Sequence, residues 1–170
     1  AYAHGIASYA LAEAYGMTEK PFILPVLKKA IKRIVAGQKS DGGWVYMVEN
    51  PGVEDLRFAE FGDQGSSDTS VSGWQFQALK AAYNTGAVFP DIEEALEASI
   101  KNFYRVYSNQ NGSFGYKNRS HKTDNHKLTG VGSLGLQSWK HGHPSEEEKR
   151  ATLKKAMEHI LQNNLAMDYA

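Results

Sequence analysis

Charged side chains are missing from one long stretch in the middle of the chain. After Asp68, no charged residue appears until Lys80, and the stretch between them contains Trp74 and Phe76. A surface helix keeps a charged face, so a helix that avoids charge for about three turns is surrounded by protein on most sides. Asp68 is well suited to cap the start of such a helix. The pattern therefore predicts an enclosed helix from Asp68 to about Tyr83.

Two other stretches have the same character. Residues 2–15 carry a single charge, Glu13, and are rich in Ala and Tyr. Residues 126–139 are nearly uncharged and contain Gly130, Gly132 and Gly135. Because glycine costs helix stability, we expect close helix packing at these three positions. Both stretches are predicted to be enclosed helices.

Three amphipathic segments alternate with the enclosed ones. Residues 21–36, 90–104 and 144–161 place apolar side chains at helical spacing and charged side chains on the other side. In the last segment the apolar stripe consists of Leu153, Ala156, Met157, Ile160 and Leu161. The order of segments predicts an all-α fold of six helices in three hairpins, with enclosed inner helices and amphipathic outer helices.

The segments also repeat in sequence. Residues 10–15 match residues 78–83 with Gly5 over Gly73, and the third enclosed segment matches through Gly130 and Leu136. The outer segments correspond as well, with Ile31 over Ile100. A unit of two helices and a loop cannot bury its own inner face, so such units stack side by side. The chain is predicted to be a helical array.

A glycine–aromatic loop follows each of the first two outer segments. The first contains Gln38, Gly43 and Trp44; the second contains Gly112 and Phe114. The second loop is degenerate, because Tyr107 stands where the helix alignment would place the glutamine. We expect the aromatic rings to pack over the neighbouring helix ends, with the glycines allowing tight turns. The loop motif is predicted to be structural.

The stretch Gln38–Trp44, followed by Asp68–Trp74, resembles the prenyltransferase and squalene oxidase repeat family, which includes the squalene-hopene and oxidosqualene cyclases. The resemblance covers nearly the whole chain, and the first loop is its most specific part. It implies an α/α toroid, in which inner helices line a central cavity. Three hairpins are fewer than such a toroid usually has. Residues 1–170 are therefore expected to form a single helical repeat domain that belongs to a longer toroid or chain.

Composition excludes several classes of function. Lys plus Arg and Asp plus Glu are both 19, so no net charge would attract nucleic acid. The apolar runs are too short to span a bilayer. The absence of cysteine excludes disulfides and the cysteine-containing zinc site of protein prenyltransferases, and it leaves the cellular compartment open.

The resemblance makes Asp68 the candidate catalytic residue. In a class II terpene cyclase, Asp68 would stand at the end of an aspartate-rich motif, and the proton-donating aspartate would fall on Ser67. Serine cannot supply that acid, so Asp68 is predicted to be a helix cap rather than a catalyst. The alternative is a terpene cyclase or prenyltransferase-type enzyme in which Asp68 is the acid and Trp74 and Tyr9 stabilise cations.

No metal or other cofactor is predicted. His121, Asp124 and His126 cluster before the third enclosed segment and have residue types that suit zinc. Their spacing, however, matches no ligand motif, and loop or capping roles explain them as well.

Four residues on the enclosed helices are candidates for binding a ligand. His4, Tyr9, Trp74 and Phe76 could line a cavity for an apolar small molecule, a sugar or a peptide. The leading hypothesis is a squalene-cyclase-like module that binds a ligand or partner on its concave inner face, without a complete catalytic motif. A weaker alternative is a polysaccharide-processing toroid. Apolar flanks on the end hairpins predict self-association or continuation in a longer chain.

Overall fold

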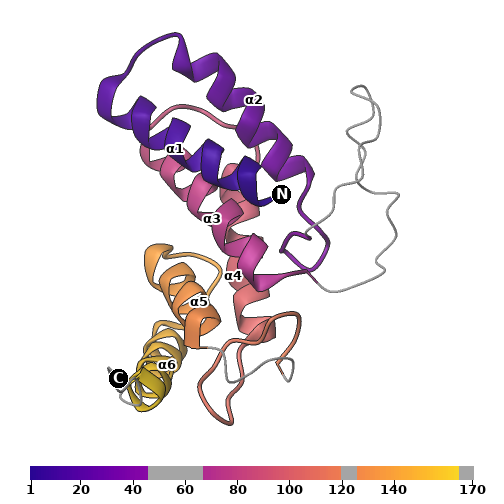
Figure 1. The fold of residues 1–170 in the computed structure, drawn as a ribbon, viewed down its shortest axis with the longest axis vertical. Coiled ribbons are helices and arrows are strands. Elements are labelled where there is room, and N and C mark those ends of the chain that lie inside the picture. Colours follow the sequence, from indigo (N-terminus) through magenta and orange to yellow (C-terminus); the bar gives the residue numbers. More distant parts are fainter. Residues whose placement is uncertain (46–66, 120–125, 165–170) are drawn as a thin grey trace, which may run out of the picture.

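The computed structural model describes residues 1–45, 67–119 and 126–164, and within these ranges every regular element is a helix. The six helices are α1 (Tyr2–Thr18), α2 (Ile23–Ala36), α3 (Thr69–Asn84), α4 (Ile92–Val106), α5 (His126–Ser138) and α6 (Glu146–Asn164). Figure 1 shows the α1–α2 hairpin at one end of the molecule and the α5–α6 hairpin at the other. The predicted all-helical fold and its six helices are confirmed.

Helix α3 is the central element of the fold. It packs against α1 and α5, the other two helices predicted to be inner ones, and also against α2 and α4. Its buried residues lie on several sides of the helix and include Val71, Phe76, Leu79 and Ala82. The prediction of an enclosed helix is therefore confirmed for α3.

Helix α1 departs from the same prediction. Its buried residues are Gly5, Ser8 and Ala12, whereas Ile6 and Met17 are exposed. The reason is its position at one end of the molecule (Figure 1), where α2 and α3 are the helices that cover it. The absence of charge in this stretch therefore did not indicate enclosure, and the prediction is wrong for α1.

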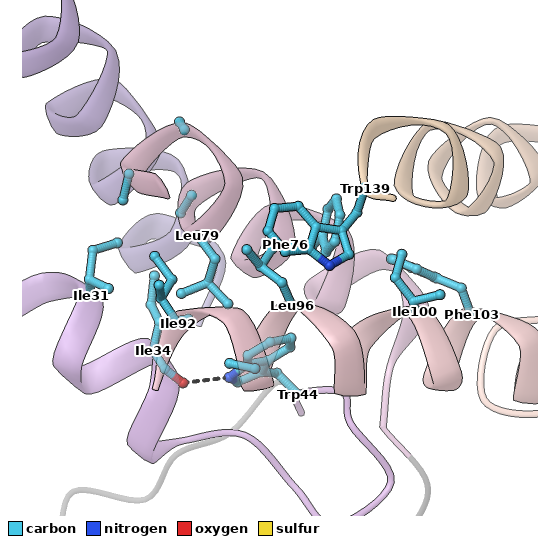
Figure 2. Close-up of a cluster of buried hydrophobic side chains, with 14 of the residues drawn as sticks. Ile31, Ile34, Trp44, Phe76, Leu79, Ile92, Leu96, Ile100, Phe103 and Trp139 are labelled. Carbon is cyan, nitrogen blue, oxygen red and sulfur yellow. Dashed lines mark hydrogen bonds between the residues drawn. The ribbon is translucent and has the colours of Figure 1, made fainter. Parts of the chain in front are cut away.

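The hydrophobic core lies between α3 and the outer helices α2 and α4 (Figure 2). Its large side chains come from α2, α3, α4 and the segments that follow α2 and α5: Ile31, Ile34, Trp44, Phe76, Leu79, Ile92, Leu96, Ile100, Phe103 and Trp139. Each fully buried side chain of this size contributes about 1.5–3 kcal/mol by leaving water. The edge contact between Phe76 and Phe103, with ring centroids 5.6 Å apart, joins α3 to α4.

Helix α6 is only partly buried. Thr152, Ala156 and His159 are buried, but Met157 and Leu161 are exposed although they belong to the predicted apolar stripe. Helix α6 packs on α5, and no other helix of the described chain makes an extensive contact with it. The predicted apolar stripe is therefore wider than the surface that covers it.

Gly135 in α5 allows close helix packing, as expected, because a Cβ atom there would overlap the ring of Phe103 of α4. At Gly132 a Cβ atom would overlap the ring of Phe114, so this glycine makes room for the second loop and not for a helix. The same expectation is wrong for Gly130, because a Cβ atom there would have nothing within 4 Å.

Candidate functional site

The first glycine–aromatic loop is docked on α4, the outer helix of the next hairpin. The Gln38 amide nitrogen lies 2.9 Å from the Gly42 carbonyl oxygen, 2.8 Å from that of Ala95 and 3.2 Å from Ser99 Oγ. Gly42 has a φ of 83°, and a Cβ atom there would overlap the Ala98 carbonyl oxygen. This loop could not approach α4 so closely with any other residue at Gly42.

Trp44, the aromatic residue of this loop, forms hydrogen bonds to both α2 and α3. The Trp44 indole N–H donates to the Ile34 carbonyl at 2.8 Å, as Figure 2 shows, and its backbone N–H donates to Ser72 Oγ at 2.9 Å. A Cβ atom at Gly43 would overlap Ser67 Oγ, so glycine is needed there too. Gln38, Gly43 and Trp44 thus connect the first hairpin to the second.

The second loop docks in the same way with different side chains. Gly112 also has a positive φ, 77°, and a Cβ atom there would lie 2.5 Å from the Lys155 carbonyl oxygen of α6. The Phe114 N–H donates to Thr129 Oγ1 at 3.2 Å. Tyr107 is buried and hydrogen-bonds Thr152 on α6, much as Gln38 bonds to α4; burial raises the pKa of Tyr107, and this bond opposes the rise. The second loop is a structural repeat of the first.

Asp68 caps α3, as predicted. Its carboxylate accepts from the backbone N–H groups of Ser70 and Val71, at 2.8 and 3.2 Å, and from the Ser70 hydroxyl. Tyr116 also bonds to Asp68, and this bond is the largest cause that raises the pKa of Tyr116 to about 12, followed by burial. Four donors therefore meet one buried carboxylate, whose hydrogen bonds hold the start of α3 and the Tyr116 hydroxyl.

Ser67 is a buried structural residue. The resemblance to the terpene cyclases would place the catalytic acid at this position. The Ser67 hydroxyl accepts from Asn102 Nδ2 at 2.9 Å and from Arg105 Nη2 at 3.2 Å. Its backbone N–H donates to Asp41 Oδ2 at 2.9 Å, and Arg105 forms an ion pair with the same oxygen at 3.1 Å. These four residues join the first loop, the start of α3 and α4. Their one carboxylate, that of Asp41, is paired with Arg105.

The four candidate ligand-binding residues are not brought together. Phe76 is fully buried against α4, so its prediction as a ligand contact is wrong: it faces the core. The His4 ring bonds to the Ala30 carbonyl at 3.1 Å and therefore points toward α2. Tyr9 is half-buried and packs on the core. Trp74, at 39% exposed, is the candidate with a large accessible surface.

Trp74 lies on the face of α3 that the other helices leave open. The residues of α3 that are not buried form one stripe along the helix, namely Ser70, Trp74, Gln77, Lys80, Tyr83 and Asn84. On the neighbouring inner helices, Ile6 and Leu134 are also exposed. A Cβ atom added at Gly5 would lie 3.1 Å from Trp74 Cβ, and one at Gly73 would overlap Val131. We call the apolar residues Ile6, Trp74, Val131 and Leu134, which come from α1, α3 and α5, the inner surface.

A cation lies beside aromatic rings at one end of this stripe. Lys80 Nζ lies 5.4 Å from the Trp139 ring centroid and 5.6 Å from that of Tyr83, and it donates to Asn84 Oδ1 at 2.6 Å. Burial lowers the pKa of Lys80. The Tyr83 and Trp139 rings meet edge to face at 4.8 Å. At this end of the stripe the Lys80 ammonium group therefore lies over the rings of Tyr83 and Trp139.

The histidines of the described chain do not form a metal centre. No group of three or more metal-ligating side chains occurs in the described residues. His121, Asp124 and the side chain of His126 lie outside them. His143 bonds to the Trp139 carbonyl at 2.7 Å and to the Tyr104 hydroxyl at 3.1 Å, and burial is the largest cause that lowers its pKa. It therefore stabilises the turn between α5 and α6.

Sequence reasoning missed the network around Asp41. Its position in a glycine-rich turn is a signal for local bonding, and its carboxylate does accept from the Gly43 N–H at 3.1 Å. Nothing in the sequence indicates that Arg105 and Asn102 meet it from α4.

None of the described helices is long and apolar enough to cross a membrane. No family model matches the chain, and neither a curated protein nor a solved structure matches it.

Proposed function

We propose that this chain is a helical repeat module of the squalene-cyclase and prenyltransferase type, and that it binds an apolar molecule or peptide on its inner surface without a catalytic acid. The observation that carries this proposal is the exposure of Trp74 on α3, together with that of Ile6 on α1 and Leu134 on α5, the two helices that pack on α3 as neighbours. Large exposed apolar side chains that lie on adjacent helices are typical of binding surfaces.

The repeated loops support a toroid-like arrangement of the hairpins. Each loop uses a glycine with positive φ to reach the next outer helix, and each donates an N–H group to a hydroxyl on the next inner helix. The same connection made twice gives successive hairpins a similar relation, as a curved array requires. In such an array the inner surface is concave and α2 and α4 form the outer wall.

The environment of Asp68 supports binding without catalysis. The Asp68 carboxylate is engaged in capping α3 and in the bond to Tyr116, so it has a structural role. Its neighbour Ser67 has no acidic proton to give, and its hydroxyl is engaged by Asn102 and Arg105. The binding surface therefore lies next to a capped helix end rather than next to an acid.

A fluorescence titration tests the proposed binding. Trp44 and Trp139 are buried, so a ligand on the inner surface should change mainly the emission of Trp74. We expect farnesol, an apolar polyene alcohol, to cause a saturable change in the wild-type chain. In Trp74→Phe both the signal and part of the affinity should be lost. Failure of isoprenoid alcohols and of apolar peptides to give a saturable signal would contradict the proposal.

Incubation with squalene separates binding from catalysis. We expect no cyclised product from the wild-type chain. A product that disappears in Asp68→Asn, while the variant keeps its helical circular dichroism, would overturn the non-catalytic proposal and favour the terpene cyclase alternative.

A further inference from the structure

Lys80 is the single charged residue of α3, and it belongs to the same partly exposed stripe as Trp74. Trp74, Gln77 and Lys80 follow one another at intervals of three residues, so each is a surface neighbour of the next. Six positions separate Trp74 from Lys80, which corresponds to about 9 Å along the helix axis. The stripe therefore has a large apolar side chain at one position and a cation further along the same helix.

Helix α5 lies beside this part of α3. A Cβ atom at Gly73 would overlap Val131 of α5, and Lys80 lies over the ring of Trp139, the residue that follows α5. The two helices are therefore parallel neighbours over this length. Leu134, three residues after Val131, lies on the same side of α5 and is 50% exposed. Apolar surface of α5 thus lies beside the part of α3 that ends at Lys80.

The charge of Lys80 is not neutralised by a carboxylate. Within the ranges that the structure describes, no carboxylate forms an ion pair with it. The partners of Lys80 are uncharged: its Nζ atom donates to Asn84 Oδ1 at 2.6 Å and lies over the rings of Tyr83 and Trp139. Burial lowers the pKa of Lys80, and no carboxylate opposes this effect. Asn84 takes one of the three N–H donors of the ammonium group, which leaves two for another acceptor.

The side chain of Gln77 is a second polar group beside Lys80. Gln77 is half-buried, and its amide makes no hydrogen bond within residues 1–45, 67–119 and 126–164. Residues three apart on a helix have Cβ atoms about 5–6 Å apart, so one small anion can contact both side chains. An ammonium group and an amide N–H group suit the two oxygens of a carboxylate. A single cation balances the charge of a carboxylate, whereas a diphosphate would keep most of its charge.

We propose that the carboxylate of an amphipathic acid binds at Lys80 and Gln77, and that its apolar chain lies on the inner surface toward Trp74. Because binding on the inner surface is itself the proposed function, this step rests on it and adds the class of ligand: a carboxylic acid whose hydrocarbon chain spans at least about 9 Å. Apolar burial stabilises the bound chain, and a charge-assisted hydrogen bond stabilises the head group. A neutral ligand of the same shape makes only the first of these contacts.

Isothermal titration calorimetry with farnesoate and farnesol, which share one hydrocarbon chain and differ in the head group, tests the ligand class. Farnesoate is ionised at neutral pH, and we expect the wild-type chain to bind it at least about tenfold more tightly than farnesol. Lys80→Met keeps an apolar side chain and removes the charge, so this preference should be lost while the affinity for farnesol stays the same. Lys80→Arg should keep most of the preference. Lys101→Met removes one positive charge from an exposed position of the outer helix α4, and this matched control should bind like the wild type.

Three results would overturn the assignment of the carboxylate to Lys80. Binding of farnesol without tighter binding of farnesoate would do so and would leave the proposed function intact. Absence of binding by either ligand would contradict both. An equal loss of farnesoate affinity in Lys80→Met and Lys101→Met, with both variants keeping their helical circular dichroism, would show that net charge attracts the acid and Lys80 does not.

Discussion

The two glycine–aromatic loops reach the same geometry with different chemistry. The first uses an amide at Gln38, an indole at Trp44 and an ion pair between Asp41 and Arg105. The second uses a phenol at Tyr107 and a phenyl ring at Phe114, which is fully buried. The second loop also packs its two aromatic rings on each other, with the Tyr107 and Phe114 centroids 5.1 Å apart.

Two features are shared by both loops and define the junction. One is a glycine with positive φ, whose missing side chain admits a carbonyl oxygen of the next outer helix. The other is a hydroxyl on the next inner helix, Ser72 or Thr129, which accepts the N–H of the aromatic residue. The comparison teaches that backbone geometry and one acceptor are constant, whereas the side chains that surround them vary.

The largest expected effect comes from removal of the aromatic rings. Trp44→Ala and Phe114→Ala should each destabilise the fold by about 3–5 kcal/mol, because each leaves a cavity between hairpins. Trp74→Ala, at an exposed position, is the control and should cost about 1 kcal/mol or less. Urea denaturation followed by circular dichroism measures all three. If Phe114→Ala were as mild as Trp74→Ala, the second loop would not be a repeat of the first.

The shared glycines come next. Gly42→Ala and Gly112→Ala should each cost roughly 2–4 kcal/mol, because the added Cβ atom meets a backbone oxygen as well as an unfavourable φ. Gly86 also has a positive φ, 74°, but a Cβ atom there would have nothing within 4 Å. Gly86→Ala should therefore cost only the conformational part, about 1–2 kcal/mol. Equal effects at all three positions, measured by denaturation, would show that docking contributes nothing.

A smaller effect is expected from the shared hydroxyl groups. Ser72→Ala and Thr129→Val each leave one buried N–H group of the loop without its acceptor, at a cost of about 1–2 kcal/mol. The two substitutions should be similar in size, since they break the same bond in two repeats. Hydrogen exchange of the Trp44 amide should accelerate in Ser72→Ala, and that of the Phe114 amide in Thr129→Val. No acceleration, or acceleration of the other amide, would show that the two hydrogen bonds are not equivalent.

The smallest expected effect on stability comes from the titration of Tyr116. Tyr116 lies just beyond the second loop and bonds to Asp68, which raises the pKa of Tyr116 to about 12. Because the folded-state pKa is raised, this bond stabilises the fold below about pH 10 and its contribution is lost as the pH rises toward 12. Ultraviolet titration should show this tyrosine ionising last, together with Tyr104, whose pKa is also about 12, mainly because of burial. In Asp68→Asn, Tyr116 should ionise earlier; an unchanged titration would contradict the bond.

The sequence predicted the helices, their order and the capping role of Asp68, because these depend on local periodicity and local hydrogen bonds. Enclosure was harder to predict. Helix α1 and the stripe of α6 have the composition of buried surfaces, but their exposure depends on which elements lie beside them. Both are at the ends of the molecule, where composition alone cannot show what covers a helix.

The candidate site likewise has parts that the sequence could predict and parts that it could not. Trp74 could be found as a large aromatic on an inner helix, but Phe76, two residues later, faces the core, because successive helical positions differ by about 100°. The network of Asp41, Ser67, Asn102 and Arg105 joins segments that are far apart in the sequence, and no local pattern predicts it. Long-range polar contacts of this kind become visible only once the hairpins are stacked.

The central claim is that the inner surface of α1, α3 and α5 binds an apolar ligand. Its most direct test is a titration of the isotope-labelled chain with farnesol, followed by amide chemical shifts. The account predicts saturable shifts concentrated at Ile6, Trp74, Val131 and Leu134, with little change at the Gln38–Trp44 loop. Shifts spread evenly over the molecule, or concentrated on the outer helices, would contradict it.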